Sequence, residues 1–122
     1  MYNQSMSDRK KILILEKDDF LREIIGKLLH EKGGFMFSAY CVSEGINAVK
    51  NHTIDTIILG TSCDEYRGKE TLGYIRKKLN NANINFYILN HSDDELDFIP
   101  KDQQIKISDL SVAEIVAAIK VS

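Results

Sequence analysis

The segment Asp55-Thr56-Ile57-Ile58-Leu59-Gly60 is the most apolar strand candidate of the chain and decides its fold class. A short, nearly continuous apolar run is typical of a strand that is covered on both faces of a parallel sheet. Ligand and reaction sites of such sheets lie just past the carboxyl ends of the strands. Gly60 stands at that end and supplies no carboxylate, hydroxyl or thiol, so the place expected to do chemistry lacks a reactive group.

Short apolar runs of this kind alternate along the chain with segments of helical periodicity. Four of the five helical segments are preceded by a polar residue that can cap them. The predicted strands are residues 11–15, 35–41, 54–59, 84–89 and 104–107. The predicted helix starts are a cap at Asp18 or Asp19, a cap at Ser43, a helix from Lys69, and capping boxes at 92–95 and 111–114.

Five β-α units with short connections predict a doubly wound α/β domain, a parallel sheet with helices on both faces. Pro100 must end the helix that follows the capping box at 92–95, so the fourth helix is expected to be shortened.

Length and composition predict one domain at residues 10–122, preceded by a disordered lead-in at residues 1–9. The chain has 122 residues, of which 43% are hydrophobic and 28% charged, with a formal net charge of -2. This charge gives no general attraction for nucleic acid or an anionic membrane surface, and no membrane span or signal peptide is apparent. Cys41 and Cys63 have neither zinc-site nor redox-pair spacing and fit reduced thiols in a cytoplasmic protein.

Two stretches resemble the receiver (CheY-like, response-regulator) domains of two-component signalling. Residues 12–22, ILILEKDDFLR, are similar to that family's ILIVDDxPxxR, and residues 54–76 follow its pattern PDLVLLDxxMPxxDGxExLxxIR without a gap. The resemblance covers residues 10–122 and is weakest between Ser92 and Asp109. It implies a flavodoxin-like sheet of five strands in the order 2-1-3-4-5.

In that family, an aspartate at the end of the third strand accepts a phosphoryl group, and two acidic residues after the first strand hold Mg²⁺. A Thr or Ser after the fourth strand and a Lys after the fifth contact the phosphoryl oxygens. These groups supply the nucleophile and offset the charge of the transferring group. The resemblance places Gly60, Glu16, Lys17, Asn90 and Ser108 at these positions.

One register alternative concerns the lysine after the fifth strand. Phe98-Ile99-Pro100-Lys101 resembles the family's aromatic-x-x-Lys, which would put Lys101 at that position in place of Ser108. This register leaves too few residues after Asn90 for a helical crossover, so Ser108 is favoured.

Other residues near the carboxyl edge have two interpretations each. Lys17 either pairs with Glu16 or is solvated, and Asp18 and Asp19 are better explained as helix caps than as metal ligands. His91 is the histidine that could contact a ligand or respond to pH, although a plain structural role is favoured.

Substitute phosphoacceptors are not expected in the loop after Gly60. Asp64 is expected to face solvent, and Thr61, Ser62 and Cys63 have no adjacent base in the sequence that could activate them.

The chain is therefore predicted to be an atypical receiver domain that acts in phosphorelay signalling without being phosphorylated. It is expected to be a protein-interaction module and not an enzyme, to bind no cofactor and to have lost Mg²⁺ binding. Signalling proteins such as a histidine kinase or an output domain are the expected partners. The resemblance places their surface on the fourth helix, fifth strand and final helix.

Two other functions compete with this prediction. The first is a switch that is phosphorylated on a non-standard acceptor. The second is a small ligand or nucleotide binder on the flavodoxin-like scaffold, against which stands the lack of a Walker loop or GxGxxG motif.

Overall fold

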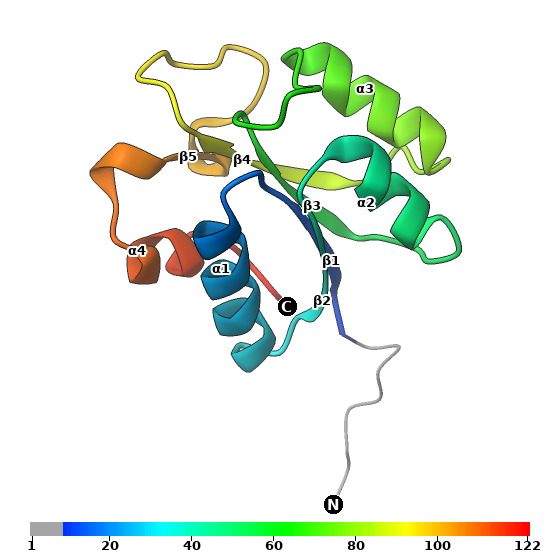
Figure 1. Cartoon of the computed structure of the whole chain (residues 1–122), viewed down its shortest axis with the longest axis horizontal. Coiled ribbons are helices and arrows are strands. Elements are labelled where there is room, and N and C mark those ends of the chain that lie inside the picture. Colours follow the sequence, from blue (N-terminus) through cyan, green and yellow to red (C-terminus); the bar gives the residue numbers. More distant parts are fainter. Residues whose placement is uncertain (1–8) are drawn as a thin grey trace, which may run out of the picture.

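The protein, seen in a computed structural model that describes residues 9–122, is built on a five-stranded parallel sheet in the order β2-β1-β3-β4-β5 (Figure 1). This confirms the predicted doubly wound α/β fold. Residues 1–8 of the predicted lead-in lie outside the described part. The strands are β1 Lys11–Leu15, β2 Phe35–Ala39, β3 Thr56–Gly60, β4 Asn85–Asn90 and β5 Gln104–Lys106.

The helices cover both faces of the sheet, with α1 and α4 on one face and α2 and α3 on the other (Figure 1). None of these described helices has the length and apolar content that a membrane span requires. The helices are α1 Asp19–Glu31, α2 Val42–Val49, α3 Lys69–Lys78 and α4 Val112–Ala117, with 3-10 turns η2 Lys101–Gln103 and η3 Ile107–Asp109.

β1 shows why the apolar strands are continuous and do not alternate with polar residues. Ile12 and Ile14 pack under α1 and α4, whereas Leu13 and Leu15 pack under α2 and α3. All four side chains are fully buried. Because helices cover both sides of the sheet, both faces of this central strand are lined by apolar side chains.

Two of the predicted helix starts are confirmed. The carboxylate of Asp18 accepts a hydrogen bond of 2.9 Å from the backbone N–H of Leu21 and caps α1. Ser111 and Glu114 form the reciprocal capping box that starts α4. In both cases the capping residue and its partner are three residues apart, so the local sequence is sufficient to predict the helix start.

The predicted cap of α2 at Ser43 is wrong. The helix starts two residues earlier, with Cys41 as its N-cap residue, and Cys41 makes no side-chain cap bond. The carboxylate of Glu65 accepts hydrogen bonds from the backbone N–H groups of Val42, at 2.6 Å, and of Ser43, at 3.2 Å. A residue from the loop after β3 thus satisfies the free donors of the first turn, which suits the positive end of a helix dipole.

The shortened fourth helix expected from the box at 92–95 is also wrong. The crossover between β4 and β5 contains no α-helix, only the turn η2 at its end. The Ser92 hydroxyl accepts a hydrogen bond from the N–H of Asp94, two residues on, a local bond that competes with helix formation.

Side-chain amides hold this crossover in its irregular conformation. The amide of Gln104 accepts from the N–H of Leu96 and donates to the carbonyls of Leu96 and Ile99. The amide of Asn90 likewise accepts from Ser92 N–H and donates to the carbonyl of Asp94. These bonds satisfy backbone groups that a helix would otherwise pair.

We predict that Gly45→Ala destabilises the protein although alanine is the better helix former. A Cβ at residue 45 would collide with the side chain of Leu15 and lie 3.4 Å from that of Leu13. Overpacking costs about 1–3 kcal/mol, which outweighs the gain of about 1 kcal/mol in helix propensity. Thermal unfolding measures the difference.

Gly73→Ala in α3 is the matched control, because a Cβ at residue 73 meets nothing within 4 Å. It should raise the melting temperature. Equal effects of the two substitutions would contradict the close packing of α2 on β1.

Candidate functional site

The candidate site at the carboxyl edge of the sheet is built around a hydrogen bond between Glu16 and His91. Glu16 follows β1 and His91 follows β4, and the distance from Glu16 Oε1 to His91 Nε2 is 2.7 Å. Because β3 lies between these two strands, the bond has to pass over Gly60. The structure therefore brings together three residues that are far apart in sequence.

The carboxylate of Glu16 is completely buried and fully hydrogen-bonded. Its Oε2 accepts from the hydroxyl of Ser62, at 2.7 Å, and from the backbone N–H of Asp18, at 2.8 Å. The imidazole of His91, whose side chain is 29% exposed, provides the third partner. A buried charge is tolerated only when it is paired and hydrogen-bonded, and these donors meet that need.

Gly60 leaves the space that this carboxylate fills. A Cβ at residue 60 would lie 3.0 Å from Cδ of Glu16 and closer still to its Oε1. Glycine is therefore required by a close approach and not by an unusual backbone angle. The side chain of Glu16 occupies the volume into which a residue at position 60 would extend.

Lys17 does not pair with Glu16. Its ammonium lies 3.0 Å from the carboxylate of Asp64, and both side chains are largely exposed. An exposed ion pair of this kind contributes little to stability. Asp64 faces solvent as expected, and the cation at residue 17 points toward the loop after β3.

Asp18 and Asp19 make their side-chain interactions with α1. Asp18 caps α1, and the carboxylate of Asp19 binds the guanidinium of Arg22 at 2.6 Å. Within residues 9–122, no group of three or more Asp, Glu, His or Cys side chains is arranged to hold a metal ion.

Of the other two positions of the resemblance, Asn90 follows the sheet partner of Gly60 in β4, and Ser108 lies in η3 after β5. Asn90 is buried, but both ends of its amide bind the crossover. Ser108 is exposed in η3, where its hydroxyl contacts Asp109 at 3.4 Å. Lys101 lies in η2, before β5 begins, and pairs with Glu95 at 3.5 Å. The lysine level with Asn90 in the sheet is Lys106, which the sequence analysis did not single out.

The loop after Gly60 contains one contact that corrects the sequence analysis. The expectation that no base lies beside its hydroxyl groups is wrong for Ser62, whose Oγ donates to the carboxylate of Glu16. Thr61 differs, since its hydroxyl accepts a hydrogen bond from the N–H of His91. The base comes from the end of β1, so the local sequence around Ser62 gave no sign of it.

Cys63 is kept in the thiol form. Burial raises the pKa of Cys63 to about 12, and the charges of Glu16, Glu65, Cys41 and Asp64 act in the same direction. A thiolate is the nucleophilic form of cysteine, so this residue is unreactive at neutral pH.

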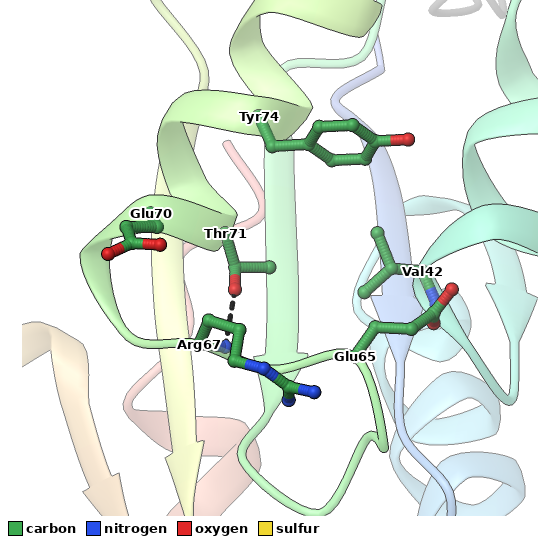
Figure 2. Close-up of a pocket in the computed structure, with 6 residues that line it drawn as sticks. All are labelled: Val42, Glu65, Arg67, Glu70, Thr71 and Tyr74. Carbon is green, nitrogen blue, oxygen red and sulfur yellow. Dashed lines mark hydrogen bonds between the residues drawn. The ribbon is translucent and has the colours of Figure 1, made fainter.

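A pocket of about 340 Å³ lies beside this loop, between α2 and α3 (Figure 2). Tyr74 extends across its upper side, and Thr71 Oγ1 accepts a hydrogen bond of 2.6 Å from the N–H of Arg67. Glu65 lines the pocket with the same carboxylate that caps α2. The side chains of Glu65 and Thr71 thus already bind backbone N–H groups of α2 and of the loop.

Comparisons with known proteins identify the fold. No family model matches the chain, and no curated protein does. A LuxR-family DNA-binding response regulator from Staphylococcus aureus is similar, with a TM-score of 0.66 at 18% identity over 89% of this chain and 94% of that one. An orphan response regulator of H. pylori has a TM-score of 0.68 at 18% identity, over 88% and 91% of the two chains.

A third similar structure is the response regulator TrrA from Thermotoga maritima in complex with Mg²⁺-BeF. Its TM-score is 0.58 at 25% identity, over 69% of this chain and 71% of that one. The chain thus has the fold of the receiver (CheY-like) domains of response regulators, as the sequence resemblance implies.

We predict that Cys63 makes stability depend on alkaline pH. Since its folded-state pKa of about 12 lies above the ordinary value of 9.0, the stabilisation is present below pH 9 and is lost as the pH rises toward 12. The free energy of unfolding should fall with pH up to about 1.4 kcal/mol per unit more steeply than in Cys63→Ala. Urea unfolding under reducing conditions, below and above the ordinary thiol pKa, measures both slopes. Parallel slopes would show that Cys63 is not shielded.

Proposed function

We propose that this domain acts in two-component signalling as a receiver-fold module that binds other proteins and is not switched by phosphorylation. One observation carries the proposal: the buried carboxylate of Glu16 fills the space over Gly60 and is held there by Ser62 and His91. The volume that a phosphoaspartate would need is thus taken by a side chain that is itself fully hydrogen-bonded.

The loss of Mg²⁺ binding belongs to the same proposal. Mg²⁺ requires several oxygen ligands in near-octahedral geometry. The two oxygens of Glu16 are already used by three donors, and Lys17 adds a positive charge at the neighbouring position. Binding a dication would require breaking these bonds, and residues 9–122 contain no group of three or more Asp, Glu, His or Cys side chains that could hold it instead.

Because Gly60 offers no carboxylate to accept a phosphoryl group and the Glu16 carboxylate is already engaged, we propose that the domain does not catalyse phosphotransfer and is not an enzyme. The face that includes β5, α4 and the crossover is where partners of receiver domains are expected by the resemblance. In this chain the crossover is irregular and held by Asn90 and Gln104. A partner that recognises this face therefore meets a surface different from that of a receiver with a complete fourth helix.

A phosphorylatable switch remains the second candidate, and the contact of Ser62 with Glu16 favours it. A carboxylate at 2.7 Å could accept the hydroxyl proton. It is nonetheless a much weaker base than the alkoxide it would create, which opposes this proton transfer.

We predict no gain of a phosphoryl group when the chain is incubated with acetyl phosphate and Mg²⁺, because residue 60 is a glycine. Intact-mass spectrometry measures the gain, with a phosphorylatable receiver domain as the positive control. A gain of one phosphoryl group would refute the main proposal. If the gain maps to Ser62 and disappears in Ser62→Ala, the second candidate is correct.

We predict that Gly60→Asp does not restore phosphorylation. The new side chain would collide with Glu16 and place a second carboxylate beside a buried one, while Lys17 still opposes a metal. The variant should also lose stability by about 2–4 kcal/mol, as expected for an overpacked and poorly paired buried charge. Acetyl phosphate labelling and thermal unfolding test both effects.

Gly60→Ala separates the steric effect from the charge effect in this experiment. The combined variant Glu16→Asp, Lys17→Asp and Gly60→Asp removes the obstruction and supplies two acidic residues after β1, so it is the comparison expected to bind Mg²⁺. Efficient Mg²⁺-dependent labelling of Gly60→Asp alone would contradict this prediction and show that the carboxyl edge of the sheet can still bind Mg²⁺.

A further inference from the structure

A second pocket, of about 330 Å³, lies between α3, β4 and the crossover, on the face where the predicted fourth helix would have packed. Apolar side chains from all three elements form its walls, among them Leu72 of α3, Phe86 of β4 and Phe98 of the crossover. Leu72 and Phe86 belong to the core of this face, and Phe98 packs against it. The irregular crossover thus leaves an opening that reaches the hydrophobic core.

The charged residues of this pocket are all positive. Lys69 and Arg76 of α3 line it, and no Asp or Glu among the described residues does. Neither cation forms an ion pair with a carboxylate within residues 9–122. The pocket therefore combines apolar walls with positive charge that has no counterion in the described chain.

Arg76 is the residue that most needs a partner. Its guanidinium carbon lies 4.8 Å from the centre of the Phe86 ring, a cation–π contact that fixes the orientation of the group. Its Nε is buried and has no hydrogen-bond partner. Burying a donor without an acceptor is unfavourable, and an oxygen acceptor supplied from outside would offset part of that cost once the side chain adjusts. A carboxylate matches the donor geometry of a guanidinium.

We propose that this pocket binds an acidic segment of a partner protein, with one large apolar side chain against Phe98 and Pro100 and a carboxylate on Arg76. Lys69 provides a second positive charge for a neighbouring acidic residue. The inference rests on the proposed role as an interaction module, but it names a surface beside α3 and not the face of β5 and α4.

The chemistry of the pocket favours such a peptide over other anionic ligands. A small inorganic anion would leave the partly exposed side chains of Phe98 and Ile99 in contact with water. A nucleic acid is disfavoured by the net charge of -2. A peptide with alternating acidic and apolar residues would pack its apolar side chains on the walls and pair its carboxylates with the two cations.

A random dodecapeptide display library tests this proposal on the full chain. Peptides are selected on the wild-type protein after depletion on Arg76→Gln. We expect the enriched peptides to be acidic and to contain an aromatic or large aliphatic residue. Synthetic copies should bind Arg76→Gln at least about tenfold more weakly, the effect of losing a charged hydrogen bond, and backbone NMR shifts should map to α3 and residues 98–103.

Lys77→Gln is the matched control, because it makes the same charge change on the next residue of α3, outside the pocket. It should change affinity less than twofold, and Lys69→Gln provides a second pocket variant if Arg76→Gln unfolds. The proposal is overturned if no peptides distinguish wild type from both pocket variants, or if the peptides that do so are not acidic. This outcome is independent of phosphotransfer, since labelling with acetyl phosphate tests the proposed function and peptide selection tests only this pocket.

Discussion

The carboxylate of Glu16 is the interaction on which the carboxyl edge of the sheet depends. It leaves β1, passes over β3 and reaches His91 after β4, and this path exists only because residue 60 has no side chain. The same carboxylate receives the N–H of Asp18 at the start of α1 and the hydroxyl of Ser62 in the loop after β3. One buried charge therefore ties together the ends of three strands, and its need for partners fixes all three connections.

The central strands and several helix starts could be predicted from sequence because their signals are local. The apolar run of β1 and the caps at Asp18 and Ser111 each involve residues within a few positions of one another. Glu16 and Gly60 were also placed at the correct edge, because the carboxyl ends of parallel strands meet there. The hydrogen bond of Glu16 over Gly60 could not be predicted, because its partner His91 is 75 residues away in the sequence.

The two wrong helix predictions, at 92–95 and at Ser43, also result from contacts between residues that are distant in sequence. The box at 92–95 has the pattern of a helix start, but the amide of Gln104, eight residues after Leu96, binds the backbone that a helix would use. Ser43 is a good cap residue by type, but Glu65 reaches its N–H from the loop after β3. A local propensity of about 1 kcal/mol is overridden when tertiary contacts supply several hydrogen bonds.

The cap that Glu65 places on α2 has a consequence for motion in this molecule. The N–H groups of Val42 and Ser43 donate hydrogen bonds to Glu65, which lies in the same loop as Ser62 and Cys63. That loop cannot lift away without uncovering the first turn of α2, so we expect the two segments to open together. A displacement of the loop after β3 would therefore also disturb the start of a helix on the outer surface.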